Sequence, residues 1–198
     1  KPASLTPGAV ALMAEVAAST LPENLVQAVI GRGALGQALA EHRGIDAVSF
    51  TGSVEVGKRV ATAAAGHLAE VSLELGGKNP VLLNDASDLE KVLDQILLAA
   101  FAVCGQRCTA VSRVIVHRDI EEAVVSGLAA RAAAMEPKDG MIEGAKIGPL
   151  ASAQQLEDVA GFVSRAVSDG AVIAAGGHRL EIPGRGYFYA PTILRGVT

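Results

Sequence analysis

The sequence has few aromatic residues and few cysteines. Its 198 residues include four Phe, two Tyr and no Trp, although 50% of the chain is hydrophobic. This composition disfavours an aromatic-rich β-sandwich and suits helices packed closely on a parallel sheet. The two cysteines, Cys104 and Cys108, are separated by three residues and make a poor disulfide framework. We therefore expect a reducing, cytoplasmic location.

Long apolar runs and stretches of positive charge are also missing. The longest unbroken apolar run, residues 96–104, has nine residues and is too short to span a bilayer. The net charge is −4 and no basic stripe occurs, which argues against nucleic acid or an anionic membrane as a partner. No signal peptide pattern opens the chain. Because the first residue is Lys1 and not Met, we expect the chain to be an internal segment of a longer protein.

Hydrophobic patterning in the first part of the chain predicts alternating helices and strands. We expect strands over residues 25–30, 47–50 and 71–75, and helices over residues 7–19, 34–43 and 54–65, with Thr6 as the first N-cap. This β-α-β-α-β alternation predicts right-handed crossovers and a parallel sheet covered on both faces.

The pattern restarts after Gly76 and Gly77. We expect strands over residues 80–83, 113–116, 171–175 and 187–190, and helices over residues 89–101, 120–135 and 152–168, the last capped by Ser152. Two glycines after a strand permit a change of direction. The sequence therefore predicts an α/β protein with a domain boundary at these glycines, dividing residues 1–76 from residues 77–198.

Two turns that join a strand to a helix carry phosphate-binding patterns. Residues 31–36 match G-x-G-x-x-G, with Gly33 as the second glycine, but no acidic residue lies at the end of the next strand as a dinucleotide fingerprint requires. Thr51, Gly52 and Ser53 form a second such turn, whose free N–H groups and serine hydroxyl suit a pyrophosphate oxygen. The alternatives are a tight turn at the first site and a plain N-cap serine at the second.

Cys108 is a candidate nucleophile. Gly105 breaks the preceding helix, so Cys108 is expected on a loop or at a helix start, where backbone N–H groups and Arg107 favour the thiolate. Local sequence alone weighs a nucleophile and an ordinary cysteine equally. Cys104 continues the apolar pattern of the helix and is expected to be a small core residue.

Glu74 is a candidate general base, because it is a carboxylate in a strand that otherwise looks buried. The alternative is simple alternation, in which Ser72 and Glu74 share a face that is exposed to water. The four histidines have no metal-ligand spacing and are expected on the surface, so we expect no metal.

Several segments together resemble the aldehyde dehydrogenase superfamily. Residues 50–57 are similar to its cofactor-domain turn, residues 73–80 to its glutamate signature and residues 105–108 to its cysteine signature. Glu74 and Cys108 are 34 residues apart, the separation familiar in this family. Residues 1–3 and 186–192 extend the resemblance over essentially the whole chain.

The resemblance implies a partial cofactor domain over residues 1–76 and a partial catalytic domain over residues 77–198. It implies that Cys108 attacks an aldehyde, that its backbone N–H stabilises the oxyanion, and that Glu74 activates the water that hydrolyses the resulting thioester. The residues implied in cofactor binding are Lys1, Ser4, Gly33, Thr51, Gly52, Ser53, Leu75 and Gly76. Within this family the pyrophosphate lies near Ser53, and Gly33 flanks the adenine side.

The resemblance also bears on cofactor, substrate and assembly. Ser4 stands where members that prefer NAD often carry a glutamate, so we expect NADP or NAD, with NADP favoured. Residues 105–113 resemble members that act on semialdehydes, and Arg107 either attracts an anionic substrate or is an ordinary surface arginine. The parent protein is expected to be a homodimer or homotetramer.

Three parts of the family pattern are absent from this chain: the upstream asparagine of the oxyanion hole, the downstream segment that contacts the nicotinamide ribose, and the oligomerisation strands. We therefore expect the chain alone to be inactive. Two alternatives remain, a dehydrogenase that releases an acyl-CoA and a catalytically silent dinucleotide-binding homologue. Glu74 argues against the first, because enzymes of that kind commonly lack the general-base glutamate, and the presence of both Cys108 and Glu74 argues against the second.

Overall fold

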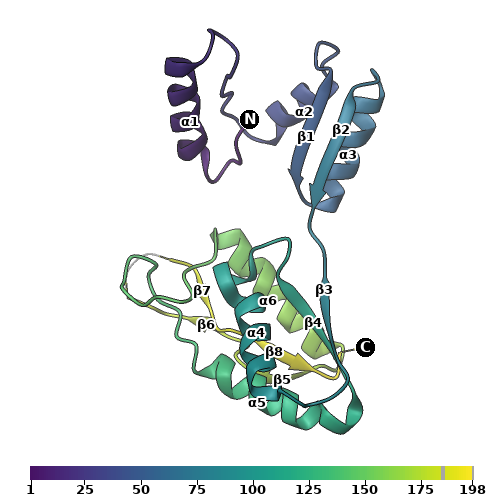
Figure 1. The fold of residues 1–198 in the computed structure, drawn as a ribbon, viewed down its shortest axis with the longest axis vertical. Coiled ribbons are helices and arrows are strands. Elements are labelled where there is room, and N and C mark those ends of the chain that lie inside the picture. The colour runs from purple at the N-terminus through teal and green to yellow at the C-terminus, as the bar shows by residue number, and fades with distance from the viewer. Residues whose placement is uncertain (184–185, 198) are drawn as a thin grey trace. The chain divides into compact units, whose positions relative to one another are not determined.

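The computed structural model describes residues 1–183 and 186–197, and the chain divides into two compact units, Lys1–Gly76 and Gly77–Thr198 (Figure 1). None of the helices in the described residues is long and apolar enough to cross a membrane.

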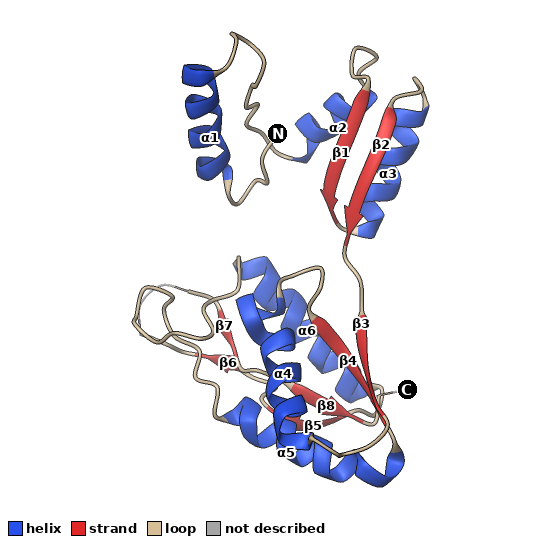
Figure 2. Ribbon diagram, viewed as in Figure 1, coloured by secondary structure: helices blue, strands red, loops and turns tan. Residues whose placement is uncertain are grey.

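The first unit is built around a pair of parallel strands. Its elements are α1 (Pro7–Thr20), α2 (Gly33–Glu41), β1 (Ala47–Gly52), α3 (Val54–Ala65) and β2 (Glu70–Leu75). β1 and β2 pair in parallel, from Ala47 opposite Glu70 to Gly52 opposite Leu75. α3 packs against both strands and α2 packs against α3 (Figure 2). The segment from β1 to β2 is thus a βαβ unit, as the alternation predicted.

One prediction in this unit is wrong. Residues 25–30 form no strand, and Leu25 and Ile30 are 65% and 62% exposed. Apolar residues make a strand only where a neighbour completes the hydrogen-bonded ladder, and among the described residues β1 and β2 pair only with each other. Thr6 is the N-cap residue of α1, as predicted, although its side chain makes no capping hydrogen bond. Pro7 at the first helical position still favours the start of α1.

The second unit contains more elements. They are β3 (Asn79–Leu83), α4 (Leu89–Phe101), β4 (Val111–Val116), α5 (Glu121–Ala133), α6 (Ala153–Ser168), β5 (Val172–Ala175), β6 (Arg179–Leu180), β7 (Phe188–Tyr189) and β8 (Ile193–Arg195), with 3-10 turns at Ala102–Gly105 and Arg118–Ile120. β3 and β4 are parallel, whereas β5 with β8 and β6 with β7 are antiparallel. The sequence predicted neither β6 nor β8, and it did not predict antiparallel pairing. These strands have two and three residues, too few for a periodic pattern to be recognised.

The core of the second unit lies between α4, α5 and the strands. Its buried residues are Leu83, Leu93, Ile96, Leu97, Val124, Leu128 and Ala132. Gly127 permits α5 to approach α4, because a Cβ there would lie 2.4 Å from Leu93 Cδ1. Arg131 of α5 adds a polar link to α4 through ion pairs with Glu90 and with Asp94, the latter at 2.8 Å. The cap predicted for α6 is confirmed, since Ser152 Oγ accepts a hydrogen bond from the N–H of Gln155 at 3.1 Å.

Candidate functional site

The carboxyl ends of β1 and β2 bring together five of the predicted site residues. Thr51 lies opposite Glu74 and Gly52 lies opposite Leu75 in the parallel register, and Ser53 follows directly after β1. Parallel strands end at one edge of a sheet, and ligands of open α/β sheets bind outside that edge. The first unit therefore has a polar, glycine-containing edge with one carboxylate.

Ser53 caps α3 at this edge. Its Oγ accepts a hydrogen bond from the N–H of Val56 at 3.3 Å, which confirms the N-cap interpretation. A hydroxyl donates as well as accepts, so the proton of Ser53 remains available to an anion at the positive end of the helix dipole. Gly57 brings α3 close to β2, because a Cβ there would lie 2.6 Å from Leu75 Cδ2. The two interpretations of Ser53 are therefore compatible.

Lys1 lies beside the G-x-G-x-x-G turn. Its Nζ donates hydrogen bonds to the carbonyl of Gly31 at 3.0 Å and to that of Pro2 at 2.6 Å. A Cβ on Gly36 would lie 3.4 Å from Lys1 Cε, so the lysine stem lies against α2. Gly33, at the start of α2, faces open space, since a Cβ there would meet nothing within 4 Å. An ammonium group beside an open helix start provides a cationic donor for an anionic ligand.

The donor set of the first unit fits a dinucleotide. Ser53 at the start of α3 offers a hydroxyl for a pyrophosphate oxygen, and the ammonium of Lys1 has three N–H groups, two of which donate to backbone carbonyls. Ser4 is exposed in the turn that precedes α1, and no partner of its hydroxyl occurs within the described residues. Gly76 is exposed at the end of the unit and has open space around its Cα.

Glu74 is not buried. It is exposed in β2, on the same face as Ser72, while Leu73 and Leu75 are partly buried. The alternation that the sequence allowed as an alternative is therefore present. Within the described residues its carboxylate forms neither an ion pair nor a hydrogen bond. The observation that supports a chemical role for Glu74 is its position at the carboxyl end of β2.

Cys108 is an exposed thiol in a tight turn of the second unit. The turn runs from Arg107 to Ala110 and is closed by the N–H of Ala110, which donates to the carbonyl of Arg107 at 3.1 Å. Cys108 is the second residue of this β-turn. Its N–H therefore lies in the same peptide plane as the carbonyl of Arg107, which accepts the hydrogen bond that closes the turn. In a trans peptide these two groups point in opposite directions. The N–H of Cys108 therefore points out of the turn, as an oxyanion donor must.

Cys104 has a different environment. It is half-buried, its thiol donates to the carbonyl of Gly148 at 3.0 Å and contacts that of Pro149 at 3.5 Å, and burial raises its pKa. A thiol with a raised pKa is a poor nucleophile. The backbone at Val103 and Cys104 has φ values of 54° and 56°, in the left-handed region. Cys104 is thus a structural residue at a bend of the chain, and Cys108 is the exposed thiol.

The residues that hold this turn were not predicted from the sequence. Asn79 Nδ2 donates to the carbonyl of Cys108 at 2.7 Å and to that of Ala110 at 3.1 Å. Gln106 Oε1 accepts a hydrogen bond from the N–H of Ala151 at 2.9 Å. Asn79 lies inside the glutamate signature, and an asparagine before a proline at the start of a strand was the available signal. Arg107 is exposed and forms no ion pair within the described residues.

The histidines play no evident part in either site. Among the described residues no group of three or more His, Cys, Asp or Glu side chains is arranged to hold a metal ion. His67 is partly buried, and its Nε2 is buried without a hydrogen-bond partner, so its predicted surface position was wrong. His178 contacts the carbonyl of Gly176 at 3.1 Å through Nδ1.

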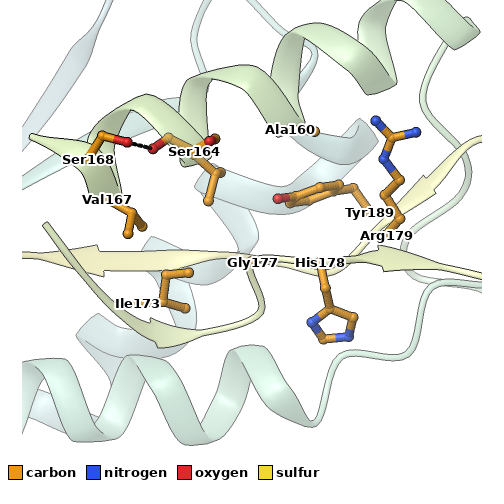
Figure 3. A pocket seen from close by; sticks show the side chains of 10 residues that line it. Ala160, Ser164, Val167, Ser168, Ile173, Gly177, His178, Arg179 and Tyr189 are labelled. Carbon is orange, nitrogen blue, oxygen red and sulfur yellow. Dashed lines mark hydrogen bonds between the residues drawn. The ribbon is translucent and has the colours of Figure 1, made fainter.

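A cavity of about 420 Å³ lies between α6 and the strands β5 to β7. In Figure 3, Tyr189 and Arg179 lie beside α6, whereas His178 points away from that helix. Burial raises the pKa of Tyr189, and the positive charge of Arg179 opposes that shift. None of the predicted site residues is among those that line this cavity.

Comparison with known proteins shows the following similarities. The model of the aldehyde dehydrogenase family matches residues 1–198. An alpha-ketoglutaric semialdehyde dehydrogenase of Bacillus subtilis is 40% identical over 182 residues, which cover 90% of this chain and 37% of that protein. A betaine aldehyde dehydrogenase of Brucella anthropi is 37% identical over 201 residues, which cover 100% of this chain and 41% of that protein. The crystal structure of a betaine aldehyde dehydrogenase point mutant from Staphylococcus aureus, in complex with NAD+, has a TM-score of 0.91 at 31% identity and covers 98% of this chain and 40% of that one. The chain thus spans about two fifths of the length of these proteins.

Proposed function

Because the chain belongs to the aldehyde dehydrogenase family, we propose that the whole protein oxidises an aldehyde to a carboxylic acid. The observation that carries this proposal is the exposed thiol of Cys108 in a turn whose backbone N–H points outward. A nucleophile beside a preorganised N–H donor is the arrangement that addition to a carbonyl requires.

Cys108 forms the covalent intermediate. Its thiolate attacks the aldehyde carbon, and the carbonyl oxygen becomes the oxyanion of a thiohemiacetal. The N–H of Cys108 donates to that oxyanion and lowers the barrier. Bound NAD(P)+ would supply the acceptor for the hydride that this carbon must lose to become the carbonyl carbon of a thioester.

Glu74 completes the reaction as a general base. Its carboxylate takes a proton from water, the resulting hydroxide attacks the thioester carbon, and the carboxylic acid leaves as the thiol of Cys108 is restored. Glu74 is suited to this role because it is exposed at the carboxyl end of β2 and has no competing partner within the described residues. A positioned general base contributes about 10²–10⁴-fold to the rate.

The first unit binds the cofactor in this proposal. Ser53 and the N-terminus of α3 hold the pyrophosphate, and Lys1 holds the adenosine ribose beside Gly33. Ser4 carries no negative charge that would repel a 2′-phosphate, so the cofactor is NADP or NAD, with NADP favoured. The NAD+ complex of the Staphylococcus aureus relative supports a nicotinamide dinucleotide. The first unit is then the C-terminal part of the cofactor domain, and the second unit is the N-terminal part of the catalytic domain.

We propose a semialdehyde as the substrate. The Bacillus subtilis relative is an alpha-ketoglutaric semialdehyde dehydrogenase, and exposed Arg107 beside Cys108 can attract the carboxylate of such a substrate. We further propose a homodimer or homotetramer in a reducing compartment such as the cytoplasm, where the two cysteines, both free, remain thiols.

Rapid mixing of the whole protein with aldehyde and NAD(P)+ tests the roles of Glu74 and Cys108. Glu74→Gln is expected to give a burst of NAD(P)H equal to the enzyme concentration, followed by a steady state about 10²–10⁴-fold slower than in wild type. Cys108→Ala is expected to give no burst.

Glu70→Gln is the matched control, because Glu70 is exposed at the opposite end of β2. This variant should turn over aldehyde like wild type. A Cys108→Ala protein that retains the burst would overturn the proposal.

A further inference from the structure

The start of β3 carries an irregularity next to the turn of Cys108. In the parallel pairing of β3 with β4, Asn79 lies opposite Val111 but Pro80 lies opposite Arg113, so one extra residue bulges from β4 at this point. Proline has no N–H to give to the ladder. Bulges are frequent next to active sites, where they re-aim a side chain.

The side chain of Asn79, which lies in β3 opposite this bulge, is hydrogen-bonded to the turn that carries Cys108. Both N–H groups of the Asn79 amide are used: one donates to the carbonyl of Cys108 at 2.7 Å and the other to that of Ala110 at 3.1 Å. Together with the hydrogen bond from Ala110 to Arg107 that closes the turn, they involve all four peptide planes from residue 107 to residue 111. These planes include the ones on both sides of the Cys108 Cα.

The backbone that carries Asn79 is fixed in turn by Arg113. Its guanidinium donates to the carbonyl of Lys78 through Nε at 3.1 Å and through Nη2 at 2.8 Å. Arg113 belongs to β4, which begins directly after the turn. Asn79 therefore holds the turn of Cys108. Arg113, in the strand that follows this turn, holds the peptide bond between Lys78 and Asn79.

We propose that Asn79 is a positioning residue for Cys108 and that Arg113 fixes the backbone of Asn79. The proposal rests on the proposed role of Cys108 as the nucleophile. The two hydrogen bonds of Asn79 keep the thiol and the N–H of Cys108 in a single orientation relative to the bound aldehyde. Misplacement of reacting groups by about 1 Å can cost about 10²-fold in rate.

The test is Asn79→Asp in the whole protein. Aspartate has the same shape, but as a carboxylate it cannot donate, so it faces two carbonyl oxygens that it repels. We expect kcat to fall about 10- to 100-fold with KM changed less than about threefold, and the alkylation of Cys108 by iodoacetamide to slow in parallel.

Asn84→Asp is the matched control, because it makes the same charge change at an exposed position just after β3. It should leave kcat and the alkylation rate unchanged. If Asn79→Asp does not fold, Arg113→Lys provides the second variant, since lysine has one cationic nitrogen in place of the two donors that reach Lys78. It should lower kcat by a smaller factor.

The outcomes separate this proposal from the one on which it rests. Loss of activity in Cys108→Ala together with wild-type kcat and alkylation in Asn79→Asp would refute the positioning role alone. Activity that survives Cys108→Ala would refute the proposed nucleophile itself. A lowered melting temperature with unchanged kcat in Asn79→Asp would also refute positioning, because it would show that the bonds serve stability only.

Discussion

Ser53 provides a prediction in which stability and ligand binding can be separated. Ser53→Ala removes a hydroxyl that accepts a hydrogen bond from the N–H of Val56 at 3.3 Å. This distance is just beyond the usual range of about 2.7–3.2 Å, so the loss of the cap should cost the low end of about 0.5–2 kcal/mol in unfolding free energy.

The same substitution should weaken cofactor binding by more than it weakens the fold. If the Ser53 hydroxyl donates to a charged phosphate, the lost hydrogen bond is worth about 1.5–3 kcal/mol. This corresponds to a rise in Kd of about 10- to 150-fold. Isothermal titration of the whole protein with NAD+ and with NADP+ measures the change.

Ser152→Ala is the matched control for this experiment. Ser152 caps α6 in the same manner, through a hydrogen bond of 3.1 Å from the N–H of Gln155, but it lies in the second unit. It should lose a similar unfolding free energy and keep the Kd of wild type. Equal Kd values for Ser53→Ala and wild type would refute the assignment of α3 to the pyrophosphate.

Two further predictions concern the second unit. Gly105→Ala should destabilise the whole protein by about 1–3 kcal/mol in urea unfolding, because Gly105 has a φ of 68° and an added Cβ would lie 2.9 Å from the Ala100 carbonyl oxygen. Gly140→Ala, where a Cβ meets nothing within 4 Å, should be nearly neutral, and equal effects of the two changes would contradict this explanation. The hydrogen bond from Arg195 lowers the pKa of Glu122 below its ordinary value of 4.5. The contribution of ionised Glu122 to the unfolding free energy is therefore fully present above that pH and is lost as the pH falls through the lowered pKa. Glu122→Gln should therefore lose less unfolding free energy than wild type between pH 7 and pH 3, and identical pH profiles would show that this ion pair contributes nothing.

The elements that the sequence predicted well are those whose own residues define them. α3 and α4 have the predicted bounds, Val54–Ala65 and Leu89–Phe101, because a cap or an apolar period of 3.6 residues lies within each segment. The segment 25–30 has the composition of a strand but pairs with no strand among the residues that the structure describes. Strand formation depends on residues distant in sequence, which a local pattern cannot supply.

The predictions for the candidate site divide in the same way, into features defined by local residues and features that depend on residues distant in sequence. Cys108 could be singled out from the break at Gly105, and the turn at residues 51–53 was predicted from the strand and the helix on either side of it. The other predicted strand–helix turn, at residues 31–36, follows no strand. The exposure of Glu74 could not be read from the sequence, because a strand with one wet face and a strand buried on both faces differ only in what packs on them. Asn79 was missed because its side chain bonds to carbonyls 29 and 31 residues later in the chain, a contact that exists only in the folded protein.

The most direct test of the account is to trap the acyl group on the enzyme. The whole Glu74→Gln protein is mixed with aldehyde and NAD(P)+, quenched in acid and digested with trypsin, which cleaves after Arg107 and so separates Cys104 from Cys108. Mass spectrometry should find the acyl group on the peptide that begins with Cys108. An acyl group on the Cys104 peptide, or NAD(P)H formed without any acylated cysteine, would contradict the assignment of Cys108 as the nucleophile.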